Sequence, residues 1–180
     1  MSRWAFQFFS PIILFCLMLI DGQLSSFFAH LFAYQIFPTS HLMLIFLMYT
    51  VRKHQLPYLL IMSIVLGIIY DSYFIGVIGI AAALLPLIVM FVNEIQTTVF
   101  QNRWTKIFTT IIIVFAFEVI IVVIEIIFKI FDINFVTFVV KQLAPSLILN
   151  IIFISILQFP LEAFYRDRTR KDREVKREVR

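Results

Sequence analysis

The sequence predicts an all-α membrane protein, a polytopic bundle of six transmembrane helices with both termini in the cytoplasm. Of its 180 residues 62% are apolar and 14% are charged, and the mean hydropathy is +0.99. A soluble domain would need charge over its whole surface, whereas here the charge gathers at the C-terminus and in a few short loops. Long apolar blocks without polar alternation exclude a lumen-lined β-barrel, so helices are the remaining way to satisfy the backbone in lipid.

Charged positions divide the apolar sequence into six blocks. The main breaks lie at Arg52-Lys53, from Glu94 to Lys106 and from Lys129 to Lys141. A helix needs about 20 residues to cross about 30 Å of hydrocarbon. The predicted spans run from about Trp4 or Pro11 to Ala29, from Ser40 to Val51, from Pro57 to Tyr73, from Phe74 to Glu94, from Trp104 to Phe131 and from Val136 to Ala163. Five spans are the alternative count.

The first two spans each have a competing interpretation. The apolar stretch from Ile12 to Ile20 resembles a signal peptide, but no small-x-small cleavage site follows it, so an uncleaved helix is expected. The second block is short, and a re-entrant hairpin is its alternative. The tip of that hairpin would carry Arg52, Lys53 and His54 to mid-bilayer, at about 2.5 to 3.5 kcal/mol for each charge. Two short or tilted crossings avoid this cost.

The later spans carry their own local signals. Pro57 suits the first turn of the third helix, where its missing N–H is not needed. The fourth block follows the third directly. The fifth is the longest and is rich in Ile, Val and Phe. Pro145 indicates either the start of the sixth helix or a kink within it.

The basic residues predict the orientation. With six crossings, thirteen Lys and Arg residues share one side, and Lys129 and Lys141 lie opposite. Loops rich in Lys and Arg stay in the cytoplasm, so both termini are predicted to be cytoplasmic. The net charge of +4 follows this membrane pattern, and nucleic acid is not expected as a partner.

The last residues form a separate basic tail. We expect residues 1–165 to form the transmembrane bundle and residues 166–180 to lie in the cytoplasm. The tail holds eight basic and four acidic residues and almost no hydrophobic ones, so it will not bury a core. It is expected to bind anionic lipid, at about 1 kcal/mol per basic residue near the surface, and contact with a cytoplasmic protein is the alternative.

Acidic side chains within the fifth span are candidate contacts to other helices or to a partner. Glu118 and Glu125 are seven residues apart, two helical turns, and so project from nearly the same face. Lys129 follows Glu125 by four residues, a spacing that favours an ion pair. Glu118 has no such partner in its own helix. It is therefore protonated, bonded to another helix or exposed to a polar cavity.

Other polar and small residues break the remaining spans. Asp71 closes the third span between Gly67 and Gly79, where close helix approach and a tight outer turn are expected, and it could cap the fourth helix. Asp21 interrupts the first span near the outer surface. Asn150 in the sixth span is expected to make a cross-helix hydrogen bond, which is worth about 0.6 to 2 kcal/mol.

The sequence contains no recognisable catalytic or metal-binding motif. Cys16 is the single cysteine, and His30, His41 and His54 stand singly near span ends. There is no glycine-rich phosphate loop and no G-x-S-x-G elbow, and the segments outside the membrane are too short for a catalytic domain. We therefore expect a protein that is not an enzyme and that has no cofactor.

Several features follow one another in a particular order. They are the small six-span plan, the polar break Asp21-Gly22-Gln23, the pattern Gly67-x3-Asp71-x7-Gly79, the acidic positions Glu118 and Glu125, and Asn150 followed by Pro160 and a basic tail. Over nearly the whole chain this combination resembles the bacterial rod shape-determining MreD family.

The resemblance implies a non-enzymatic component of the cell-wall elongation machinery in the bacterial plasma membrane. The partners it implies are MreC, then RodA and a penicillin-binding transpeptidase, and the actin-like MreB in organisms that have it. Bundle faces that carry Asp71, Glu118 and Asn150 would hold partner helices.

A different class of protein has a similar size and six-helix plan. The membrane subunit of an energy-coupling-factor vitamin transporter would need an outward-opening polar pocket lined with aromatic residues. The outer segment from Gln23 to Thr39 could supply part of it, although such aromatics more often form an interfacial belt.

Overall fold

The computed structural model describes residues 3–52, 54–99, 102–129 and 134–178, and these contain no strand. The helical elements in chain order are α1 (Arg3–Leu31), α2 (Leu42–Thr50), α3 (Leu56–Tyr70), the π-helical turn η1 (Asp71–Ile75), α4 (Ile80–Val99), α5 (Arg103–Ile127), α6 (Phe135–Phe138), the π-helical turn η2 (Val139–Leu143) and α7 (Ala144–Glu178). The predicted all-α fold is confirmed.

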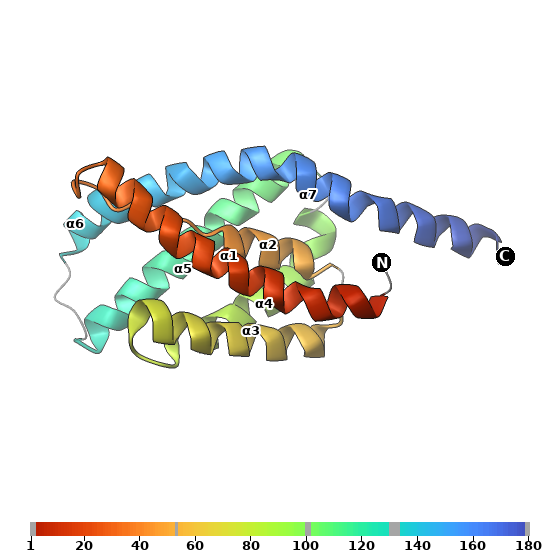
Figure 1. The fold of residues 1–180 in the computed structure, drawn as a ribbon, viewed down its shortest axis with the longest axis horizontal. Helices are drawn as coiled ribbons and strands as arrows, with labels where there is room; N and C mark the ends of the chain where they lie inside the picture. Colours follow the sequence, from red (N-terminus) through yellow and green to blue (C-terminus); the bar gives the residue numbers. More distant parts are fainter. Residues whose placement is uncertain (1–2, 53, 100–101, 130–133, 179–180) are drawn as a thin grey trace.

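The helices form one elongated bundle, and both chain ends lie at the same end of it (Figure 1). α1, α3, α5 and α7 run along its length, with α2 among them. α7 continues past the bundle, so the basic tail is helical as far as Glu178. The division of the chain into a transmembrane bundle of residues 1–165 and a separate cytoplasmic tail stays a prediction.

Among the described residues, four helices are long and apolar enough to cross a membrane, as expected for a membrane protein. They are Phe9–Leu31, Leu56–Ile75, Trp104–Ile127 and Phe135–Leu161. α4 carries a shorter apolar stretch, Ile80–Gln96, and α2 has only nine residues. The count of six crossings therefore stays a prediction, and it depends on the second and fourth spans.

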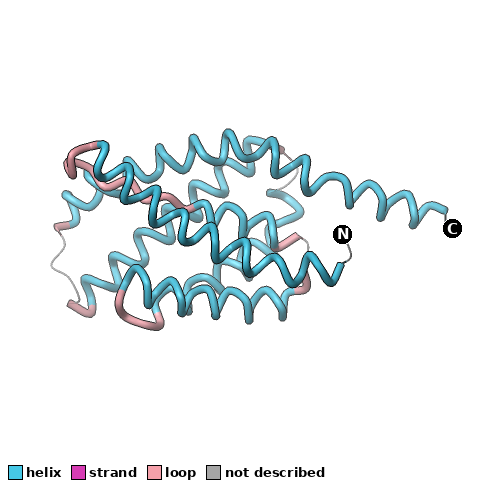
Figure 2. Tube along the Cα trace, in the orientation of Figure 1, coloured by secondary structure: helices cyan, strands magenta, loops and turns pink. Residues whose placement is uncertain are grey.

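The second predicted span departs most from a regular helix. Residues 36–41, called the extended segment from here on, have no regular secondary structure and lead into α2 (Figure 2). Extended chain covers about 3.3 Å per residue and helix about 1.5 Å, so six extended and nine helical residues reach about 33 Å, close to the thickness of the hydrocarbon. Eight of the nine α2 residues are buried, which shields this irregular path from lipid.

The predicted boundary after Tyr73 lies too early. The helix of α3 continues through η1, and α4 begins only after a turn over residues 76–79. Gly76 and Gly79 have φ values of 77° and 123°, which side chains other than glycine rarely adopt. The Gly76 N–H donates to the Asp71 carbonyl oxygen at 2.7 Å. This glycine turn, and not Tyr73, therefore ends the helix.

The last two spans also shift at their ends. α5 stops at Ile127, before the predicted end at Phe131, and residues 130–133 lie outside the described part. The final span begins with α6 and η2 and continues directly as α7. Pro145 is the second residue of α7, two positions after the end of η2. It therefore lies inside the continuous helical span Phe135–Leu161 and does not mark the start of that span. The wider π-helical turn before it accommodates a residue that has no N–H to donate.

α3 and α4 approach each other closely at Gly67. A Cβ at this position would lie 2.4 Å from the Cα of Ala82 and 2.7 Å from the carbonyl oxygen of Ala81. At Gly22 of α1, a Cβ would instead meet the end of the Phe74 ring at 2.9 Å. Backbone cannot move aside as a ring can, so Gly67 is the stricter requirement.

We expect Gly67→Ala to lower the stability of the bundle by about 1 to 3 kcal/mol, because the added methyl group overlaps α4 backbone. Thermal unfolding of the purified protein in a mild detergent would measure the fall in Tm. Gly22→Ala is the matched control and should lower Tm less, since the Phe74 ring can shift. Equal effects of the two substitutions would contradict the close approach of α3 and α4.

Six crossings predict where reporters fused to the chain should lie. A fusion after Arg180 should be cytoplasmic, and one inserted near Ile133 should be external, because the basic residues gather on the side of the termini. Paired alkaline phosphatase and fluorescent reporters would measure both positions. An external C-terminus would overturn the six-span arrangement.

Candidate functional site

A network of buried polar groups surrounds the extended segment and the start of α2. Asp21 lies within α1 and is 6% exposed. Its Oδ1 accepts hydrogen bonds from the Ser40 hydroxyl at 2.5 Å and the Leu42 N–H at 2.7 Å. Its Oδ2 accepts from the Met43 N–H at 2.8 Å. The N-cap residue of α2, His41, makes no side-chain capping bond, so a carboxylate from α1 caps α2 in its place.

Ser25 lies one turn after Asp21 on the same helix and holds the same segment. Its hydroxyl donates to the Asp21 carbonyl oxygen at 2.7 Å and accepts from the Ser40 N–H at 2.9 Å. α1 thus supplies acceptors for the backbone N–H groups of Ser40, Leu42 and Met43.

α7 binds the extended segment through two side chains on one helical face. Ser146 Oγ accepts from the Thr39 N–H at 2.8 Å. Asn150, four residues later, accepts from the His41 N–H at 2.9 Å through Oδ1, and it donates to the Thr39 carbonyl oxygen at 2.8 Å through Nδ2. The side-chain amide of an asparagine can accept a hydrogen bond from one backbone group of a segment and donate one to another. The backbone of the segment is therefore hydrogen-bonded both to α1 and to α7.

α5 contributes Glu118, which lies against the His41 side chain. His41 Nε2 and Glu118 Oε1 are 2.9 Å apart, and both side chains are 4% exposed. The His41 ring also packs edge-on against Phe117, with ring centroids 5.5 Å apart, and Tyr70 of α3 packs on the same Phe117 ring in the same manner. Glu118 is thus bonded to the extended segment and not to another helix.

A second polar site lies at the junction of η1 and α4. Asp71 is fully buried. Its Oδ1 accepts from the Ala81 N–H at 2.7 Å, and its Oδ2 accepts from the N–H groups of Gly79 at 2.7 Å and Ala82 at 3.1 Å. Asp71 therefore caps the N-terminus of α4, on the stretch that Gly67 approaches most closely.

Asp21 and Asp71 each accept hydrogen bonds from the first N–H groups of a helix, α2 and α4 respectively. The first N–H groups of a helix have no partner within it, and in a water-free interior each unsatisfied group costs several kcal/mol. A carboxylate also complements the partial positive charge of the helix N-terminus, by up to about 2 kcal/mol where it is partly buried. Both aspartates accept hydrogen bonds from backbone N–H groups that water would satisfy at a protein surface.

The acidic residues of α5 are less completely bonded. Glu118 Oε2 is buried and has no hydrogen-bond partner in the described part of the chain. Glu125 is 9% exposed, and among the described residues it forms no ion pair with Lys129, contrary to the expectation from their spacing. α5 ends at Ile127, and Lys129 has a φ of 52°, so the two side chains no longer share a helical face.

The predicted site residues fall into two sets. Asp21, Glu118 and Asn150 meet around the extended segment, while Gly67, Asp71 and Gly79 lie together at the turn between α3 and α4. Glu125 has no hydrogen bond to either set within the described ranges.

The chemistry of both sets is structural. In the part of the chain that the structure describes, no group of three or more His, Cys, Asp or Glu side chains could hold a metal ion. All four carboxylate oxygens of Asp21 and Asp71 accept hydrogen bonds from backbone N–H groups. The His30 ring contacts the Tyr34 hydroxyl at 2.8 Å, and Cys16 is exposed. The arrangement stabilises an irregular backbone path through the bundle.

Sequence reasoning missed Ser25, Ser40, His41 and Ser146 as members of the network. One signal was available, since Ser146 and Asn150 are four residues apart and so share a helical face. Ser25 and Asp21 have the same spacing on the first span. For Ser40 and His41 there was no such signal, because their contacts come from helices distant in sequence.

The chain is similar to known proteins over most of its length. Residues 2–168 match the family of the rod shape-determining protein MreD. The chain belongs to the MreD family. The cell shape-determining protein MreD of Streptococcus pneumoniae (strain ATCC BAA-255 / R6) is 31% identical over 152 residues, which cover 82% of this chain and 89% of that relative. No solved structure matches the chain.

Membership of the MreD family confirms the resemblance found in the sequence and gives the protein a role in the machinery of cell shape. In this MreD-family chain, Asp21 and Asn150 hold the extended segment and the start of α2, and Asp71 holds the start of α4.

We expect Asp21→Ala to destabilise α2 and the extended segment by about 3 kcal/mol or more, because several buried donors lose one acceptor. Hydrogen–deuterium exchange over residues 39–43, followed by mass spectrometry in detergent, should become faster. Gln23→Ala, an exposed position two residues along α1, is the control and should leave this exchange unchanged. Unchanged exchange in Asp21→Ala would contradict the capping role.

Proposed function

We propose that this protein is a non-enzymatic, multi-pass component of the bacterial plasma membrane that holds together parts of the cell-wall elongation machinery. Its role in determining cell shape follows from the family. The proposed partners are MreC first, then RodA and a penicillin-binding transpeptidase, with MreB where the organism has it. Its mechanism would be to present a fixed set of helix faces to the transmembrane helices of those proteins.

One observation carries this proposal: the buried polar groups are used within the chain. Asp21, Asp71, Ser146 and Asn150 are at most 6% exposed, and each bonds to backbone of the same chain. Such bonds fix the positions of α1 and α7 relative to the extended segment, and of η1 relative to α4. A bundle held in this way supplies rigid surfaces and leaves few polar side chains free to bind or react with a ligand.

The outer surface of the bundle is apolar along several helices. Large exposed side chains lie on α3, α4, α5 and α7, and they include Ile61, Ile64, Leu87, Phe91, Phe108, Ile112, Ile148, Ile152 and Ile156. Helices associate in lipid through close packing of such surfaces, since lipid tails are as apolar as the side chains. The shape of each face, set by the internal network, would then determine which partner helix fits.

The polar residues expected to touch a partner lie inside the bundle. Glu118 is 4% exposed, Asn150 is 3% exposed and Asp71 is fully buried. Direct contact with a partner helix would require these side chains at the surface. We therefore propose that they act indirectly, by holding the helices whose outer faces bind the partner.

The vitamin-transporter alternative has less support. Membrane transporters use interrupted helices near the bilayer midplane, and the extended segment before α2 interrupts a helical path in a similar way. The aromatic residues that would line an outward pocket are exposed, however, among them Phe27, Phe32, Tyr34 and Phe37. This position suits an interfacial belt better than a closed binding pocket.

Co-purification with MreC tests the proposal. Glu118→Leu should reduce recovery of MreC about tenfold, a loss of about 1.4 kcal/mol, because the extended segment loses its contact to α5. Affinity purification from mild-detergent extracts with quantitative mass spectrometry would measure this recovery.

Glu118→Gln is the matched control, since its side-chain amide has the same shape and can still bond to His41. It should retain most of the MreC, and both variants should insert into the membrane at wild-type levels. Normal recovery of MreC with Glu118→Leu would contradict the indirect role of Glu118. Recovery of ATPase subunits in place of MreC would favour the transporter.

A further inference from the structure

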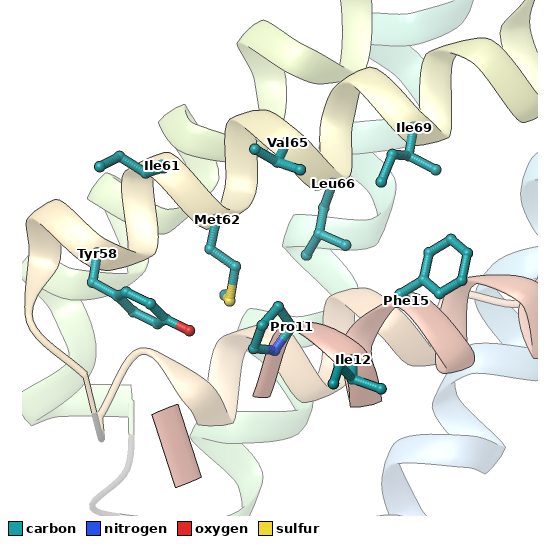
Figure 3. A pocket seen from close by; sticks show the side chains of 9 residues that line it. All are labelled: Pro11, Ile12, Phe15, Tyr58, Ile61, Met62, Val65, Leu66 and Ile69. Atoms are coloured by element: carbon teal, nitrogen blue, oxygen red, sulfur yellow. The ribbon is translucent and has the colours of Figure 1, made fainter. Parts of the chain in front are cut away.

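A narrow groove lies on the outside of the bundle, between α1 and α3 (Figure 3). α1 packs mainly against α2, and its contacts with α3 are fewer, which leaves space between the two long helices. The groove has a volume of about 410 Å³. Pro11, Ile12 and Phe15 form its α1 wall.

The α3 wall is a single stripe along the helix. Its residues recur at spacings of three and four, which places them on one face over three turns: Tyr58, Ile61, Met62, Val65, Leu66 and Ile69. Met62 and Leu66 form the floor and are 5% and 2% exposed, whereas Ile61 and Val65 form the rim and are 66% and 51% exposed. The groove is therefore a defined channel with a buried apolar floor.

The length and lining of the groove suit a hydrocarbon chain. From Tyr58 to Ile69 the α3 wall is about 16 Å long. A hydrocarbon chain, whose carbons pack at about 4 Å, would fit with its length along α3.

One end of the groove is polar and basic. The Tyr58 hydroxyl is the polar group of the lining side chains and extends towards Pro11 (Figure 3). The turn that precedes α3 carries Arg52, Lys53 and His54 in the sequence, with no acidic residue from position 51 to position 57. The Arg52 side chain is exposed. The charge at this end complements a negatively charged headgroup.

We propose that the groove binds one acyl chain of an anionic phospholipid, with the phosphate beside Arg52 and the Tyr58 hydroxyl. The lipid would fill the space between α1 and α3 and fix their separation. This inference requires that the bundle lies in a bilayer, but it does not depend on which protein partners the chain has.

The test uses the full-length protein reconstituted in nanodiscs of equal parts phosphatidylglycerol and phosphatidylcholine. Native mass spectrometry after release into detergent would count the lipids that stay bound. We expect one retained phosphatidylglycerol, favoured over phosphatidylcholine by about tenfold.

Val65→Trp should lower this retention by about tenfold, because the indole occupies the groove from its rim. Ile61→Trp, at a second exposed rim position, should lower retention to a similar extent, so that a folding defect in one variant cannot explain the loss. Ile64→Trp is the control: Ile64 lies on α3, is 42% exposed and does not line the groove, so retention should be unchanged. Arg52→Gln should weaken the preference for phosphatidylglycerol while leaving a lipid bound.

Three results would overturn the proposal. Retention that is the same in Val65→Trp, Ile61→Trp and the wild type would exclude the groove as the site. Equal retention of the two lipids by the wild type would exclude an anionic headgroup. Loss of a copurifying membrane protein in both tryptophan variants, with lipid retention unchanged, would make the groove a contact for a partner helix.

Discussion

The requirement that buried backbone be hydrogen-bonded organises this bundle. Residues 36–41 enter the bundle without helical bonds of their own, and Ser40 and His41 are buried inside it. Each buried N–H or carbonyl group without a hydrogen-bond partner would cost several kcal/mol, enough to remove much of the stability of a small domain. Asp21 and Ser25 from α1, and Ser146 and Asn150 from α7, supply the missing partners. The path of α2 depends on these four side chains.

The same logic explains the turn between α3 and α4. Asp71 satisfies the first N–H groups of α4, and Gly67 lets the two helices approach until backbone nearly meets backbone. Both features need small or polar residues where lipid-facing helices would otherwise carry leucine or phenylalanine. Close approach brings dispersion contacts along the whole helix pair, and these drive association once water is absent. The polar residues within the spans are thus chiefly devices for building the fold.

The use of polar side chains within the bundle limits what its outer surface can offer to a partner. Asp21, Asp71 and Asn150 are bonded internally, so the bundle offers its surroundings shaped apolar faces. A family role in cell shape is compatible with such faces acting as a scaffold. The groove between α1 and α3 differs from the faces around it, since it has a buried apolar floor and one polar lining group, the Tyr58 hydroxyl. A lipid bound there would leave the other faces to partner helices.

Hydropathy, charge distribution and the order of polar breaks are properties of the linear chain, so the all-α membrane class, the general positions of the long spans and the family could be predicted from them. Asp21, Asp71, Glu118 and Asn150 could also be predicted as important, since polar residues are rare in a membrane span. The groups to which they bind became known from the folded bundle. The tertiary structure made the second span an extended segment followed by a short helix, and it separated Glu125 from Lys129 by ending α5 at Ile127. The physical reason is that hydrogen bonds between residues more than a hundred positions apart, such as those from Asn150 to Thr39 and His41, depend on how helices pack and leave no periodic trace in the sequence.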